Sequence, residues 1–223
     1  MNGAALLHLL QFASPALPIG GYSYSQGLEA ALEAGIVTDA ASARAWIVRH
    51  LHEVVAQWEA PLLWRLLQAH ATGDAAALAQ WSERALAARD TAELRAESVQ
   101  MGYSLVRLLD ELGLAPAQAH THEGDVALPV AFARAVAALG IPHEEALLAM
   151  LFGWAENQVL VCVKSVPLGQ VAGQRMLLSL RPELEAAALH ARSIGDDDMS
   201  NWSPGLAILS MRHETQHGRL YRS

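Results

Sequence analysis

The sequence predicts an all-α protein, a single compact, bundle-like domain of about eight to ten helices over residues 1–223. Three observations predict this class. Apolar side chains recur at the spacing of a helix, no run alternates apolar and polar residues long enough for a strand, and glycine or proline interrupts the pattern where helices would end. A chain of 223 residues is long enough to bury about 70% of its unfolded surface around one core.

The helical period is clearest in two segments. Within residues 39–58, apolar side chains fall at i, i+4, i+7, i+8 and i+11: Ile47, Leu51, Val54, Val55 and Trp58. Residues 101–112 have the same kind of spacing, with Met101, Leu105, Leu108, Leu109 and Leu112. Each segment therefore predicts an amphipathic helix with one buried stripe.

Start and stop signals agree with this periodicity. Asp39, after Thr38, is placed to cap one helix, and Pro61 is placed to begin another. Ser23 and Gln26 have the spacing of a reciprocal cap before a short helix. A third start is Ser203-Pro204, and breaks are expected near Gly35, Gly73, Gly113, Gly140, Pro167, Pro182 and Gly195.

Three further stretches need an interpretation. Residues 115–129 and 194–203 look irregular, and we expect the second to be a flexible hinge before a final helix. Residues 146–163 are strongly apolar, but Glu156-Asn157-Gln158 leaves only about ten apolar residues before the break, against the roughly 20 that cross a membrane. This segment predicts a core helix.

Composition narrows the functional classes. The formal charge of −8 argues against a nucleic-acid binder, which would present a basic face to the phosphates. Hydrophobic residues make up 52% of the chain and charged residues only 17%, so some apolar surface should meet partners. A single cysteine, Cys162, and the lack of a signal-peptide pattern favour the cytoplasm.

The search for catalytic motifs is mostly negative. The sequence has no Gly-x-x-x-x-Gly-Lys phosphate loop, and its only lysine, Lys164, is far from any such pattern. It also has no Gly-x-Ser-x-Gly elbow, because the segment 21–25 lacks the second glycine. Nucleotide hydrolysis and serine hydrolysis by this chain are therefore not expected.

One pattern supports an enzyme. His213-Glu214-x-x-His217 would place two imidazoles on one helix face to hold zinc, with the glutamate as general base. No carboxylate or histidine follows His217, so a third ligand would have to come from elsewhere in the fold. A zinc metallohydrolase is the alternative reading. His120-x-His122-Glu123 is a weaker metal candidate in an expected loop, and we assign no metal residue.

Three segments resemble the urease accessory protein F (UreF) family. They are residues 10–29 (LQFASPALPIGGYSYSQGLE), residues 163–170 (VKSVPLGQ) and residues 212–223 (RHETQHGRLYRS). The family typically ends in RHETQYSRLFRS, so His217 and Gly218 depart from it and create the zinc-like spacing. Lys164 is notable because the chain otherwise uses arginine as its basic residue.

The resemblance implies a UreF-like all-α fold and a cytoplasmic, non-catalytic adaptor that acts as a nickel-insertion chaperone. Such a protein would dimerise, bind the scaffold UreD (also called UreH) and recruit the GTPase UreG to the urease apoprotein, where the nickel metallocentre is assembled. It would bind no cofactor tightly, and the assembled complex would handle the nickel. A regulatory effect on the partner GTPase is a further role that the resemblance leaves open.

Residues are carried over from the three segments. The resemblance implies that residues 204–223 are a partner-binding C-terminal tail that orders against UreD through Arg212, His213, Glu214, Arg219, Leu220 and Tyr221. It also implies a surface facing UreG at or near Tyr22, Tyr24, Glu29, Glu33 and Lys164. Tail arginines more often form salt bridges than arginine fingers, so no catalytic residue is assigned.

Overall fold

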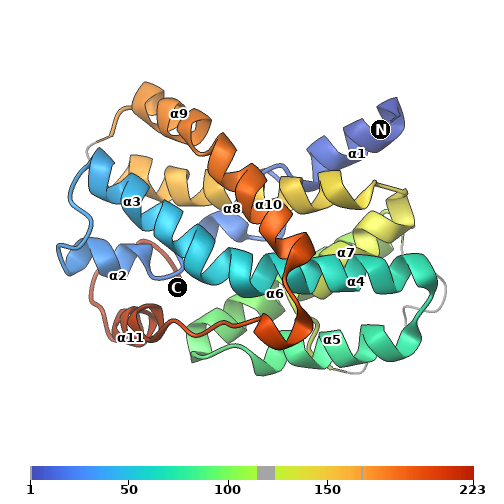
Figure 1. Ribbon diagram of the computed structural model, residues 1–223. Helices are drawn as coiled ribbons and strands as arrows, with labels where there is room; N and C mark the ends of the chain where they lie inside the picture. Colours follow the sequence, from blue (N-terminus) through green and yellow to red (C-terminus); the bar gives the residue numbers. More distant parts are fainter. Residues whose placement is uncertain (1, 115–123, 167) are drawn as a thin grey trace.

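The computed structural model describes residues 2–114, 124–166 and 168–223, which form helices and connecting turns with no strand among them (Figure 1). The helices are α1 (Gly3–Phe12), α2 (Leu28–Glu33), α3 (Ala40–His50), a π-helical segment (Leu51–Glu59), α4 (Ala60–Thr72), α5 (Ala75–Ala87), α6 (Ala92–Glu111), α7 (Leu128–Leu139), α8 (His143–Ser165), α9 (Gln170–Ser179), α10 (Arg181–Ser193) and α11 (Pro204–His213). Because α3, the π-helical segment and α4 are continuous, the described residues hold 10 helices, and the predicted all-α class is confirmed.

Several predicted helix ends are confirmed. Asp39 caps α3: its carboxylate accepts from Ser42 N at 2.8 Å, and Ser42 Oγ accepts from Asp39 N at 3.0 Å. Gly73 and Gly140 end α4 and α7 with φ of 67° and 61°, a left-handed conformation that glycine adopts without strain. Local sequence is sufficient to set these boundaries.

Pro61 lies in the first turn of α4, as predicted, although the π-helical segment runs directly into this helix. Proline has no N–H, so the carbonyl of Gln57, four residues earlier, loses its helical donor. Ser200 N supplies a replacement at 3.2 Å. A distant segment therefore satisfies the carbonyl that proline leaves without a helical donor.

The predicted capping box of Ser23 and Gln26 is wrong. Gln26 has a φ of 53° and the helix α2 begins only after Gly27, whose φ is 81°. The Gln26 side chain makes tertiary contacts instead: its Nε2 donates to Glu97 at 2.6 Å, and its Oε1 accepts from Trp154 Nε1 at 2.7 Å. These long-range bonds outweigh the local capping preference.

Helix α8 lies in the core, as predicted for residues 146–163. It is the one helix of the described part of the chain that is long and apolar enough to cross a membrane, by length and composition alone. Its buried side chains include Leu147 and Leu151, which are completely inaccessible, and it packs against α2, α3, α4, α9 and α10. This packing is that of a core helix in a globular protein.

The connection before α11 is held at several points. Arg65 donates to the carbonyls of Ala191 and Ile194 and to the Asp196 carboxylate, and Asn201 Nδ2 donates to the Ala88 carbonyl. Flexibility of residues 194–203 stays a prediction. In this conformation the connection fixes where α11 begins.

Candidate functional site

A buried carboxylate on the short helix α2 organises the C-terminal segment. Glu29 Oε1 accepts from the backbone N–H of Leu220 at 2.7 Å, and Oε2 accepts from that of Tyr221 at 3.0 Å. The Glu29 N–H itself donates to Ser25 Oγ. Glu29 therefore holds the chain end by its backbone, and the side chains of residues 220 and 221 are free for other contacts.

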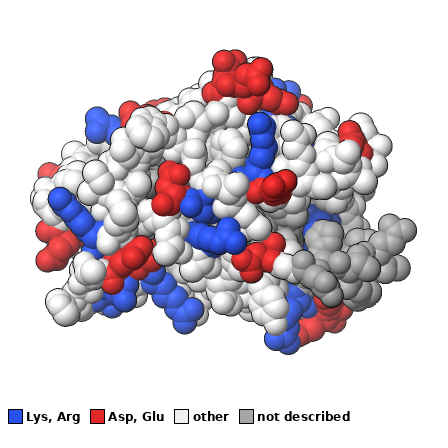
Figure 2. Space-filling view, turned by 90° about the horizontal axis from the view of Figure 1, so that it is seen from below, with Lys and Arg blue, Asp and Glu red and all other residues white. Residues whose placement is uncertain are grey.

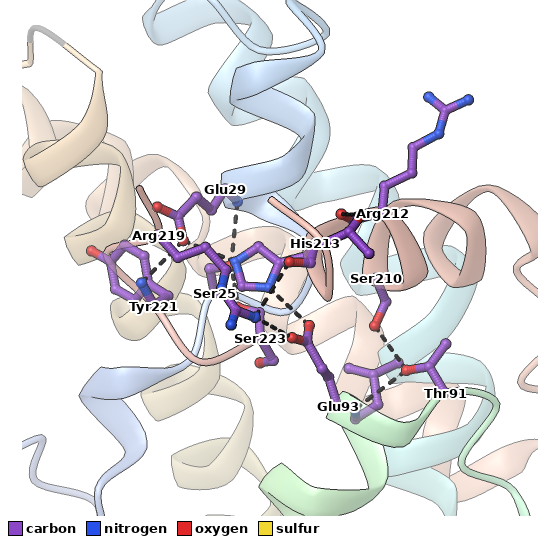
Figure 3. Close-up of polar contacts among 12 residues, drawn as sticks. Ser25, Glu29, Thr91, Glu93, Ser210, Arg212, His213, Arg219, Tyr221 and Ser223 are labelled. Atoms are coloured by element: carbon purple, nitrogen blue, oxygen red, sulfur yellow. Dashed lines mark hydrogen bonds and ion pairs between the residues drawn. The ribbon is translucent and has the colours of Figure 1, made fainter. Parts of the chain in front are cut away.

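His213 lies between two carboxylates at the end of α11 (Figure 3). Its ring is fully buried; Nε2 lies 2.9 Å from Glu29 Oε2 and Nδ1 lies 2.8 Å from Glu93 Oε2. Each ring nitrogen therefore faces a carboxylate oxygen, one on the buried Glu29 and one on the partly buried Glu93. His213 is thus a structural centre that joins α2, α6 and α11.

Arg219 completes the neutralisation of Glu93. Its Nη1 donates to Glu93 Oε1 at 2.8 Å and to the His213 carbonyl at 3.3 Å. Glu93 is 11% exposed, whereas the Arg219 side chain is 37% exposed. The Arg219 side chain is therefore partly in solvent, which screens the contribution of this ion pair to stability.

The last residues bind the N-terminal segment directly. Ser25 N donates to the Ser223 carbonyl at 2.8 Å, and Arg222 N donates to the Ser23 carbonyl at 2.8 Å. Ser223 Oγ donates to Glu97 Oε2 at 2.7 Å. Burial raises the pKa of the Glu97 carboxyl, against the opposing effect of the hydrogen bonds from Gln26 and Ser223.

Residues 163–170 reach the same place through Lys164, which contacts Tyr221. This side chain is buried, burial raises the pKa of its hydroxyl, and Lys164 Nζ lies 5.7 Å from the ring centroid. Lys164 is in the last turn of α8. Residues 10–29, 163–170 and 212–223, far apart in sequence, therefore meet around one polar cluster.

The residues that the family resemblance assigns to partner contacts form an exposed set and a buried set. Tyr22 is 59% and Leu220 71% exposed, and Glu33, Lys164, Arg212, Glu214 and Arg219 are also exposed. Tyr24, Glu29, His213 and Tyr221 are buried inside the chain. In this conformation the tail is ordered against its own chain, and its contact with a partner stays a prediction.

The geometry does not support the zinc reading. Helix α11 ends at His213, so His217 does not share a helix face with it, and both ring nitrogens of His213 face carboxylates. The described ranges contain no group of three or more His, Cys, Asp or Glu residues that could hold a metal ion. His120, His122 and Glu123 lie outside the described residues.

Glu93 and Glu97 are functional neighbours that sequence reasoning missed. Both are on α6, and they continue at intervals of four residues the buried stripe of Met101 and Leu105. Carboxylates that extend an apolar stripe are unusual, because a buried charge needs a partner. This spacing is the sequence signal that points to Glu93 and Glu97, but it does not identify the residues with which they pair.

Comparison with known proteins agrees with the geometry. The sequence model of the UreF family matches residues 37–181. The chain is similar to a protein named urease accessory protein UreF from Janthinobacterium sp. (63% identity, covering 100% of both chains). It is also similar to proteins of the same name from Nitrosospira multiformis (54% identity, 98% of both) and Azoarcus sp. (53% identity, 98% of this chain and 95% of the relative). The resemblance is confirmed: this chain belongs to the UreF family of urease accessory proteins.

Proposed function

We propose that this chain is a non-catalytic adaptor in urease maturation. It binds UreD (UreH) and recruits the GTPase UreG to the urease apoprotein in the cytoplasm, as a homodimer that holds no cofactor of its own. The observation that carries this proposal is the meeting of the three family segments around the buried cluster of Glu29, His213 and Glu93. A cluster whose polar groups pair with one another and whose rim is exposed suits binding better than catalysis.

The tail fits a scaffold contact. Leu220 is 71% exposed between Arg219 and Arg222, while Tyr221 is buried beneath them. An apolar anchor flanked by guanidinium groups can combine burial with bidentate hydrogen bonds to carboxylates. Because the backbone is held by Glu29, little ordering free energy would be needed on binding. We assign this edge to UreD.

The UreG-facing side is proposed at Tyr22, Glu33 and Lys164. All three are exposed, and Lys164 is placed by its contact with Tyr221. Tyr24 and Glu29 would act from beneath by holding the local backbone. Loss of UreG recruitment in Lys164→Ala, with UreD binding retained, is the expected result, and normal recruitment would contradict the assignment.

The molecular surface suits protein partners. In Figure 2 the charged side chains lie in separate groups with broad uncharged areas between them. Fifteen large hydrophobic side chains are exposed in the described part of the chain, including Trp202 at 81%. Exposed apolar area at this level indicates interaction surfaces. The nickel would be handled by the assembled complex.

The experiment mixes the chain with UreD and then UreG and determines the masses of the complexes by light scattering. Deleting residues 206–223 would remove His213 and the backbone N–H groups that Glu29 binds, which would disturb the fold around α2, so point variants are sharper. Leu220→Ala should weaken the UreD complex about tenfold. Leu189→Ala, 65% exposed on α10, is the matched control and should bind normally. Equal binding by both variants would contradict the proposed edge.

A further inference from the structure

A cavity of about 240 Å³ lies against the π-helical segment and shares Gln26 and Glu97 with the polar contacts described above. Its apolar walls include Phe12, Met101, Phe132 and Trp154, from four separate parts of the chain. An apolar cavity of about 150 Å³ is large enough to bind benzene. This cavity can therefore hold a molecule of one or two rings.

One wall of the cavity carries an unsatisfied polar group. His50 lines the cavity and is 7% exposed, and its Nδ1 has no hydrogen-bond partner. The ring meets Trp154 edge to face, with 5.3 Å between centroids. Burial lowers the pKa of His50 to about 4, so the ring is neutral at pH 7. A neutral imidazole can donate one hydrogen bond and accept one.

Two stretches of the chain that line the cavity have an unusual backbone conformation. The π-helical segment Leu51–Glu59 begins directly after His50 and contributes Val54, Val55 and Glu59 to the lining. The lining also includes Gln26, whose φ of 53° is uncommon for a residue other than glycine. π-Helical turns and strained backbone occur often at functional sites. Their coincidence here favours a binding site over a packing defect.

The charged groups on the lining are already paired. Arg89 and Glu59 form a two-point ion pair, and Glu97 accepts hydrogen bonds from Gln26 and Ser223. A charged ligand would therefore meet mostly apolar walls without a free counter-charge, at a large desolvation cost. A neutral ligand avoids this cost. Buried nitrogens without a partner remain on two lining residues, Nδ1 of His50 and Nε of Arg89, and the neutral His50 ring is the one that carries no charge.

We propose that this cavity binds a small neutral organic molecule of one or two rings that carries a single hydroxyl or carbonyl group, which hydrogen-bonds to His50. The apolar walls supply affinity and the imidazole selects for the polar group. Tyr22 both lines the cavity and belongs to the proposed UreG-facing side, but the tests below need no partner protein, so their outcome is separate from that of the proposed adaptor function.

The test compares two probes of nearly equal size, p-cresol and toluene, which differ by one hydroxyl. Dissociation constants are measured on the full chain by ligand-observed NMR. The wild type should bind p-cresol at least about tenfold more tightly than toluene, because a buried hydrogen-bonding group left unpaired is costly. In His50→Phe the dissociation constants of p-cresol and toluene should become about equal, while toluene binding is retained. A preference that survives in His50→Phe would overturn the proposal.

A second pair of variants locates the site. Ala149 lines the cavity, whereas its neighbour Leu148 is 39% exposed and does not. Ala149→Phe should abolish binding of both probes, and Leu148→Phe should leave it unchanged. If Ala149→Phe fails to fold, Gly153→Ala adds a smaller group to the lining, where an added Cβ would lie 3.6 Å from the Ala13 carbonyl oxygen. Gly153→Ala should weaken p-cresol binding severalfold. The absence of any binding by wild type, or unchanged binding in Ala149→Phe, would also overturn the proposal.

Discussion

The two ends of the chain contrast in the way they are held. Helix α1 is strongly apolar, yet Leu7 and Leu10 are 68% and 60% exposed, and the helix projects from the body (Figure 1). The C-terminal segment is rich in polar residues, yet Tyr221 and Ser223 are buried at 6% and 1% exposure. Much of the apolar sequence at one end stays exposed, whereas two of the last three residues at the other end are enclosed.

The difference shows that hydrogen-bond partners, and not hydrophobicity, decide which end packs. Glu29 accepts two backbone N–H groups of the tail and faces His213, whose other nitrogen faces Glu93. Buried polar groups are tolerated when each finds a partner. On α1 only Ala5 and Phe12 are buried, so most of its apolar surface remains for a partner.

The strongest test of this contrast is His213→Ala. Removing the ring leaves the buried Glu29 without a cationic partner and Glu93 with Arg219 as its remaining one, so the free energy of unfolding should fall by about 3–5 kcal/mol. Urea unfolding followed by circular dichroism measures the change. His217→Ala, an exposed histidine in the same segment, should change stability by less than about 0.5 kcal/mol. Equal effects of the two variants would mean that the cluster does not hold the tail.

His50 lines the same cavity as Phe12 at the end of α1, and it should make the stability of the protein depend on pH. An unfolded histidine titrates near 6.5, and His50 titrates at about 4, so between these values the unfolded chain binds more protons. Stability should therefore fall as the pH drops from 6.5 to 4, by about 3 kcal/mol for this group. Unfolding at a series of pH values, compared between wild type and His50→Phe, isolates the effect. Parallel curves for the two proteins would refute this expectation.

A smaller effect is expected within α1 itself. Phe12 is 4% exposed at the end of the helix, and Phe12→Leu should lower the free energy of unfolding by about 1 kcal/mol. Leu10→Ala, two residues earlier, should change it by less than about 0.5 kcal/mol because the side chain is 60% exposed. Thermal unfolding of both variants measures the difference. A large loss in Leu10→Ala would show that α1 packs along its length in solution.

The sequence predicts local features well and tertiary ones poorly. The cap at Asp39 and the helix ends at Gly73 and Gly140 depend on neighbouring residues and are confirmed. Pro61 also lies in the first turn of its helix as predicted. The capping box of Ser23 and Gln26 is wrong because Gln26 pairs with Glu97, which is distant in sequence. No local pattern reveals this hydrogen bond.

The candidate site divides in the same way. The three family segments named most of its residues, but nothing in their local patterns showed that they meet around His213. Glu93 and Glu97 were missed because α6 was read only as an amphipathic helix from Met101 onward. The burial of Tyr221 and Glu29 could not be predicted either, since it depends on the path of the chain after α11.

The most direct measurement is native-state hydrogen exchange at the amides of Leu220 and Tyr221 in the isolated protein. If Glu29 holds the tail on its own chain, both amides should exchange at least about 100-fold more slowly than that of the exposed Gly218, and the protection should disappear in Glu29→Ala. Exchange of Leu220 and Tyr221 as fast as that of Gly218 would contradict the account and leave a tail that orders only when a partner binds.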